Sequence, residues 1–143
     1  MWVKEGLTTK QLRFLLCEAE EAFYGGAAGG GKSVALLASA LQFMEEPGYN
    51  AVIIRRTFAQ LDSSDSIMHK SKIWLSGLRY KGKKARWQES KKHWVFPNGN
   101  TLSFKHMDNA NAIDDYQGGT WSTICVDEAG QFTEEMLSYP KTR

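Results

Sequence analysis

The sequence has 143 residues, with 42% hydrophobic and 24% charged residues and a formal net charge of +2. This length suits one domain with its own core, and the balance is that of an ordinary globular protein. No apolar run approaches the roughly 20 residues of a membrane helix and no signal peptide begins the chain, so we expect no membrane partner. Cys17 and Cys125 lack metal or redox spacing and are expected to be small buried thiols.

The first half of the chain alternates helical and strand-like segments. Leu12, Leu15, Leu16 and Ala19 recur at helical spacing, which predicts a helix over 7–19 with one apolar stripe. A strand is expected next, at 20–24. The helix expected at 33–44 is apolar almost all round, and the strand expected at 51–54 is continuously apolar, as buried parallel strands are. A helix is expected to cover part of 58–78.

A β-hairpin is the main feature of the second half. Its strands are expected at 93–96 and 101–104, around a turn in which Asn98 and Gly99 supply positive φ angles. A short helix is expected at 109–116 and a buried strand at 122–126. A further helix is expected from 134 onward, with Thr133 as its cap. This order predicts an α/β fold with a mostly parallel sheet flanked by helices, and the hairpin as an excursion from it.

A glycine-rich loop separates the first predicted strand from the apolar helix, and Gly26-x-x-x-x-Gly31-Lys32-Ser33 fits the phosphate-binding loop pattern in full. Backbone N–H groups can wrap a polyphosphate closely only where Cβ atoms are absent and φ can be positive, and the helix start adds its free N–H groups. Lys32 supplies a cation for the β- and γ-phosphates, and Ser33 a hydroxyl for Mg²⁺. A flexible linker would not lie between a strand and an apolar helix. The residues expected to contact ATP are Gly26, Ala27, Ala28, Gly29, Gly30, Gly31, Lys32 and Ser33.

Two acidic residues close the last predicted strand. Ligands of open α/β sheets bind at the carboxyl ends of parallel strands, so Asp127 can organise Mg²⁺, directly or through water. Glu128 can polarise a water for attack on the γ-phosphate. Two acids at a strand end are common by themselves, but together with the glycine loop they predict one site for ATP and Mg²⁺.

Three further residues have two interpretations each. Arg55 and Arg56 follow the strand at 51–54, so one of them can contact the γ-phosphate, or both are surface arginines at a strand end. Gln11 can hydrogen-bond an adenine edge, but Thr8-x-x-Gln11 is also a capping box for the first helix.

Four stretches resemble, in order, the ATPase domain of the large terminase subunit of tailed bacteriophages: GGAAGGGKSVALL, IIRRTFAQL, FPNGNTLSF and YQGGTWSTICVDEAGQFTEE. The resemblance runs from about residue 7 to residue 135. It implies a P-loop NTPase fold and an ATP-driven motor that moves duplex DNA into a capsid in the host cell cytoplasm. The family assembles as a homo-oligomeric ring on the portal protein, and the small terminase subunit is a further implied partner.

The resemblance also implies roles for single residues. Lys32 and Ser33 match the phosphate-loop pair of the family, and Asp127 matches its metal-organising aspartate. Glu128 matches the catalytic glutamate. Gln11 stands where the family often has a glutamine that contacts adenine.

The chain departs from the family pattern in two ways. Many members carry an arginine where this sequence has Gln117. In some members this arginine reaches the active site of a neighbouring subunit as an arginine finger. Because it is missing here, Arg55 and Arg56 become the candidates for that catalytic role. The coupling strand, lid and nuclease domain of the family are absent from residues 1–143. We therefore expect a truncated, N-terminal part of a terminase-like P-loop ATPase domain that hydrolyses ATP poorly alone, because Glu128 is not fixed against the phosphate loop.

A basic block interrupts a mildly acidic chain. Residues 70–92 hold nine of the 18 Lys and Arg but one of the 16 acids, Glu89, so the block carries +8 and the remainder −6. This predicts a polyanion partner, here duplex DNA bound without sequence preference, and a solvated lysine-rich loop fits equally well. Aromatic residues interleave with the block, and core packing is favoured over base stacking for them. They are Trp74, Tyr80, Trp87 and Trp94.

Two other functions stay open at this point. One is another P-loop ATPase of nucleic-acid remodelling, related to helicases, and the other is a truncated nucleotide-binding fragment without turnover. The sequence beyond a helicase-type motor continues into a second motor domain, whereas that of a terminase continues into a nuclease domain with clustered acids. Separate measurements of ATP affinity and turnover identify the fragment that binds without hydrolysis.

Overall fold

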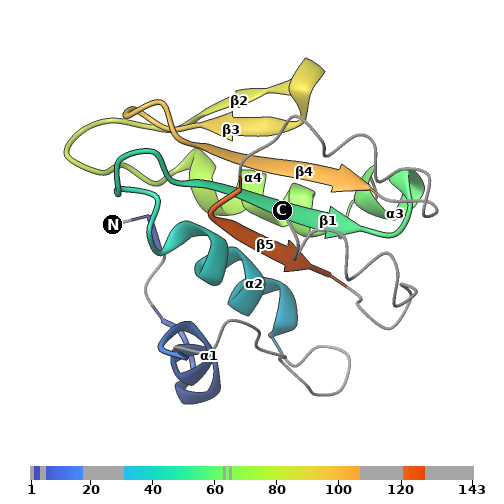
Figure 1. Ribbon diagram of the computed structural model, residues 1–143, viewed down its shortest axis with the longest axis horizontal. Helices are drawn as coiled ribbons and strands as arrows, with labels where there is room; N and C mark the ends of the chain where they lie inside the picture. Colours follow the sequence, from blue (N-terminus) through green and yellow to red (C-terminus); the bar gives the residue numbers. More distant parts are fainter. Residues whose placement is uncertain are drawn as a thin grey trace.

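The computed structural model describes residues 2–3, 6–17, 31–62, 64, 66–106 and 121–127. Its five strands form one sheet in the order β2-β3-β4-β1-β5 (Figure 1). The elements in chain order are α1 (Thr9–Leu15), α2 (Lys32–Leu41), β1 (Asn50–Arg55), α3 (Phe58–Asp62), α4 (Ile67–Ser76), β2 (Arg86–Gln88), a 3₁₀ helix (Glu89–Lys91), β3 (His93–Val95), β4 (Thr101–His106) and β5 (Thr123–Val126).

The sheet is parallel on one side and antiparallel on the other. β1 runs parallel to β4, with Asn50 opposite Thr101, and parallel to β5, with Ala51 opposite Thr123. β2, β3 and β4 form an antiparallel meander. The predicted α/β architecture is confirmed at this level. The hairpin is not an excursion, because its second strand β4 lies inside the sheet as the parallel neighbour of β1, and two of the four strand pairings are antiparallel. The P-loop NTPase assignment stays a prediction.

The strand β1 is buried on both faces, as expected of an inner parallel strand. Ala51 and Ile53 belong to a core cluster with residues of α2 and α4, such as Leu37 and Leu75. The alternate residues of β1 point to the other face of the sheet and are fully buried as well. The continuous apolar run in the sequence therefore predicted this strand correctly.

The helix α1 begins two residues later than predicted, and only part of its apolar stripe faces the core, where Leu15 packs against the core cluster. The expected helix over 7–19 is seen over Thr9–Leu15, and Leu12 and Leu16 are 46% and 77% exposed. Gln11 takes the inward position instead, because its side chain reaches across to the start of α2. Cys17, which follows this helix, is exposed, so the prediction of a buried thiol is wrong there and confirmed for Cys125.

Two helices replace the single helix expected within 58–78. Ser66 adopts an extended conformation between them and caps α4, accepting a hydrogen bond from the backbone N–H of His69 at 3.2 Å. The helix expected over 33–44 ends three residues early, at Leu41. The strand predicted at 20–24 and the helices predicted at 109–116 and after Thr133 lie outside the described residues.

The turn between β3 and β4 uses its two asparagines differently from the prediction. Gly99 has the expected positive φ of 89°, but Asn98 does not have a positive φ. Asn98 and Asn100 instead donate side-chain hydrogen bonds to the carbonyl oxygen of Met44, at 3.0 and 2.9 Å. These bonds fasten the turn to the segment that follows α2.

Tyr49 joins the end of α2 to the start of β5. Its hydroxyl oxygen lies 2.9 Å from the carbonyl oxygen of Ala40 and 2.8 Å from Oγ1 of Thr123. A phenol has one proton, which it donates to the carbonyl, so the threonine hydroxyl donates to the phenol oxygen. Burial raises the pKa of Tyr49 to about 12, so the phenol stays neutral.

We expect Tyr49→Phe to lower the free energy of unfolding by about 1–3 kcal/mol, because it leaves buried polar groups without a partner. Urea denaturation measures the change. Thr123→Val is the matched partner variant, and the cost of the double variant should be smaller than the two single costs added together. Additive costs would contradict a shared hydrogen-bond chain.

Candidate functional site

The carboxyl ends of β1 and β5 lie side by side and bring two predicted site residues together. The backbone N–H of Asp127 donates to the carbonyl oxygen of Ile54 at 2.9 Å, which extends the pairing of the strands by one residue. Nη1 of Arg55 then reaches Oδ2 of Asp127 at 2.5 Å. The Asp127 side chain is 7% exposed and that of Arg55 15% exposed, so the ion pair is largely removed from water.

The ion pair was missed from the sequence, although both residues were expected at this edge. Nε of Arg55 is buried and has no hydrogen-bond partner among the residues that the structure describes. An unsatisfied donor of this kind is uncommon in a folded protein and is a feature of sites that hold a ligand. Arg56, the next residue, is half-buried and is not the partner of Asp127.

The helix α2 runs antiparallel to β5, as two contacts show. Its residue Ala40 lies at the level of Thr123, through Tyr49, whereas Sγ of Cys125 lies 4.0 Å from the carbonyl oxygen of Leu36. The four residues from Ala40 to Leu36 span about 6 Å along the helix, and the two residues from Thr123 to Cys125 span about 6.6 Å along the strand, so helix and strand stay level with each other. One further step brings the first turn of α2 level with Asp127, and Figure 1 shows this helix start beside the arrowhead of β5.

The helix α2 begins without a side-chain cap, unlike α1 and α4. Thr8 and Ser66 cap those two helices, whereas the first residue before α2 is Gly31, and no acidic residue lies in its first turn. Gly31 has a φ of 81°, which an L residue adopts only with strain, so the expected positive φ is confirmed at this glycine. Uncapped N–H groups at a helix start favour an anion.

Gln11 combines a capping role with a contact to the glycine loop. Its Oε1 accepts from the N–H of Thr8 at 2.8 Å, and its N–H donates to Oγ1 of Thr8 at 3.2 Å, so the predicted capping box is confirmed. Its Nε2 donates to the carbonyl oxygen of Gly31 at 3.2 Å. Each end of the amide therefore makes one hydrogen bond and keeps capacity for a second, and a contact with adenine stays a prediction.

The oxygen atoms available as metal ligands at this edge, among the described residues, suit Mg²⁺. They are the buried carboxylate of Asp127 and the half-buried hydroxyl of Ser33, both hard oxygen ligands. In the part of the chain that the structure describes, no group of three or more His, Cys, Asp and Glu side chains lies close enough together to hold a metal. Mg²⁺ commonly binds through one or two protein oxygens together with substrate phosphates and water, so this sparse set suits it.

Several predicted site residues lie outside the described residues: Gly26, Ala27, Ala28, Gly29, Gly30 and Glu128. Their predicted roles stay predictions. Lys32 and Ser33 open α2 and are half-buried.

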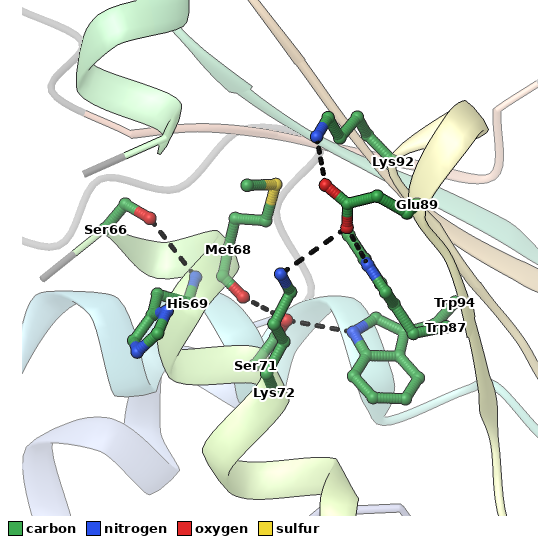
Figure 2. A network of polar contacts seen from close by, with 9 residues as sticks. All are labelled: Ser66, Met68, His69, Ser71, Lys72, Trp87, Glu89, Lys92 and Trp94. Atoms are coloured by element: carbon green, nitrogen blue, oxygen red, sulfur yellow. Dashed lines mark hydrogen bonds and ion pairs between the residues drawn. The ribbon is translucent and has the colours of Figure 1, made fainter. Parts of the chain in front are cut away.

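Within the basic block, the single acid is surrounded by cations (Figure 2). Glu89 pairs with Lys92 and, at 3.7 Å, with Lys72, and it accepts a hydrogen bond from the Trp87 indole at 2.5 Å. Nζ of Lys72 also lies 4.8 Å from the centre of the Trp87 ring. The hydrogen bonds from Lys92 and Trp87 lower the pKa of Glu89 to about 2.

We therefore expect Glu89 to titrate near pH 2 rather than near 4.5. Because the pKa is lowered in the folded state, the network stabilises the fold above pH 4.5 and loses this effect as the pH falls through about 2. The ¹³C shift of the Glu89 carboxyl group measures the midpoint. Lys92→Gln should move it upward, and a midpoint near 4.5 in the unaltered chain would speak against the network.

The aromatic residues of the basic block pack into the protein. Trp74 and Trp94 are buried, and their indole nitrogens donate to the Trp2 carbonyl and the Ser71 hydroxyl, at 3.1 and 2.9 Å. The Trp87 ring lies against Trp94. Core packing, the interpretation favoured from the sequence, is confirmed for Trp74 and Trp94.

Among the described residues, no helix is both long and apolar enough to cross a lipid bilayer. In a comparison with known families, residues 23–143 match the family described as terminase large subunit, T4likevirus-type, N-terminal. The matched region includes the glycine loop, β1 and Asp127. No curated protein and no solved structure matches the chain.

Proposed function

The chain belongs to the terminase large subunit family of the T4-like type, as an N-terminal part, and from this we infer a role in viral DNA packaging. We propose more specifically that it is part of the motor that hydrolyses ATP to drive duplex DNA into a capsid. Portal protein, small terminase subunit and further copies of the chain in a ring are the partners that this function requires.

The observation that carries the proposal is the meeting of α2 and β5 at one edge of the sheet. The uncapped first turn of α2 presents Lys32 and Ser33 at the level of Asp127. In the proposed site, Lys32 binds the β- and γ-phosphates, and Ser33 and Asp127 hold Mg²⁺. The metal, when bound, neutralises charge that develops on the phosphoryl oxygens. Glu128 orients the attacking water.

The two arginines are proposed to act differently. Arg55 is paired with Asp127, so its first role is to hold that carboxylate in place for the metal. Its buried Nε is a remaining donor for a phosphate oxygen. Arg56 is the other candidate for direct contact with the γ-phosphate. Gln11 steadies the end of the glycine loop through Gly31, and the second N–H of its amide can contact adenine.

The test measures ATP affinity and ATP turnover separately, with Glu128→Gln as the matched variant. We expect the chain to bind ATP in the presence of Mg²⁺ and to hydrolyse it slowly. Glu128→Gln should retain the affinity and abolish the turnover. Absence of binding would sink the proposal, and equal turnover in both proteins would remove Glu128 from it. Binding without any turnover would favour a nucleotide-binding fragment.

A further inference from the structure

We propose that a basic hollow, defined as the surface around Lys83, Lys84 and Arg86, binds the phosphate backbone of duplex DNA. The hollow has a volume of about 520 Å³ and is open to solvent. The inference rests on the proposed function for the identity of the polyanion, whereas the site itself follows from charge and geometry. The residues that line the hollow are Lys83, Lys84, Arg86, Val95, Phe96, Pro97 and Gly99.

The hollow lies at the amino end of the parallel strands, opposite to the proposed ATP site. It is formed where β2 begins and where β3 turns into β4 (Figure 1). Six residues of β4, Thr101–His106, separate the two ends of the sheet, a distance of about 20 Å. DNA and ATP can therefore bind at the same time.

A tight turn projects the cations of the hollow. Tyr80 and Lys83 form an antiparallel bridge, with backbone hydrogen bonds of 2.9 and 3.1 Å in the two directions. Lys81 and Gly82 between them have φ angles of 52° and 78°, the pattern of a type I′ turn. Lys84 and Arg86 follow on either side of the buried Ala85, and both line the hollow.

Three other cations of the basic block, Lys72, Lys81 and Lys92, already have partners. Lys72 and Lys92 pair with Glu89 (Figure 2). Nζ of Lys81 lies 5.3 Å from the centre of the Tyr80 ring. Within the described part of the chain, none of the three cations of the hollow forms an ion pair.

The surroundings favour duplex DNA over single strands. Proteins that bind single strands supply exposed aromatic faces on which bases stack. Here Phe96 at the floor of the hollow is buried, and the Trp87 ring lies between Lys72 and the core. Three exposed cations without a stacking platform suit a backbone that is read by charge alone.

One helix connects the hollow with the proposed ATP site. The turn that lines the hollow is fastened by Asn98 and Asn100 to Met44, just beyond the end of α2. The other end of α2 carries Lys32 and Ser33. A shift of this helix on nucleotide binding therefore reaches the hollow without an intermediate element.

The test is a salt series with the 143-residue chain and a short, fluorescently labelled DNA duplex of mixed sequence. Neutralising three phosphates gives a slope of log affinity against log salt of about −3. Lys84→Gln and Arg86→Gln should each reduce its magnitude by about 1, and the triple variant with Lys83→Gln should abolish most of it. The matched control is Lys92→Gln, which makes the same change of charge at a lysine that is paired with Glu89. It should leave the slope unchanged.

Three results would overturn the inference. They are an unchanged slope in the triple variant, tighter binding of the single strand than of the duplex, and equal competition by polyglutamate, which would indicate an acidic protein surface. Thermal unfolding checks that the variants fold. ATP affinity, measured alongside, separates the two proposals: loss of ATP binding with intact DNA binding refutes the proposed nucleotide site alone, and the reverse refutes the hollow alone.

Discussion

Replacing Arg55 with leucine is expected to lower the free energy of unfolding by about 3–5 kcal/mol. The substitution leaves the carboxylate of Asp127 buried without the guanidinium that lies 2.5 Å from it. The loss of one partner from a buried ion pair is costly because the remaining charge has neither water nor a counter-charge. Urea denaturation measures the change, and the transition should shift to a clearly lower urea concentration.

Two further variants separate the ion pair from other causes. Arg56→Leu removes the same charge one residue later and leaves Asp127 paired, so it should cost less. Arg55→Leu combined with Asp127→Leu removes both charges and should restore much of the lost stability, because a buried pair can be replaced by apolar groups at little cost. If the double variant is no more stable than Arg55→Leu, the cost does not come from the unpaired carboxylate.

Lys32→Ala is expected to weaken ATP binding about 10- to 100-fold, whether or not Mg²⁺ is present. A hydrogen bond to a charged group contributes about 1.5–3 kcal/mol, and each 1.4 kcal/mol is a factor of ten in affinity. Asp127→Asn should behave differently, because the aspartate acts on ATP through the metal. It should retain the affinity measured in EDTA and lose the increase that Mg²⁺ brings.

Isothermal titration with ATP, in Mg²⁺ and in EDTA, distinguishes these two patterns. Lys70→Ala serves as the control for Lys32→Ala, because it removes the same charge from an exposed position on α4. An equal loss in both Lys variants would show that Lys32 acts only through net charge. A loss in EDTA for Asp127→Asn would contradict a role confined to the metal.

Three elements of the fold were predictable because their sequences are strongly apolar. β1 and β5 are continuous apolar runs, and α2 is apolar almost all round, so these elements appear close to the expected places. β5 lies at the edge of the described sheet, and the predicted burial of this strand is confirmed only for Cys125. β2 was missed because Arg86 and Gln88 carry no apolar signal on an edge strand of three residues. The break between α3 and α4 depends on the cap at Ser66, whose signal is one residue in a polar stretch.

The candidate site was predicted as a set of residues but not as a set of contacts. The sequence indicated that Arg55 and Asp127 lie at one edge of the sheet, because each follows a buried strand. Their pairing depends on the register of β1 and β5, which arises from packing across a long separation in the chain. The contact between Gln11 and Gly31 is also long-range, and it accounts for the buried position of Gln11 beside the exposed Leu12.

The central claim is that the first turn of α2 and the end of β5 share one magnesium–triphosphate. Iron-mediated cleavage tests it most directly, because Fe²⁺ in the place of Mg²⁺ cuts the backbone only beside the metal when ascorbate and peroxide are added. With ATP present, we predict two cuts in the same protein, one beside Ser33 and one beside Asp127, and both should disappear with Asp127→Asn. Cleavage at only one of these two places, or cuts that do not depend on ATP, would contradict the account.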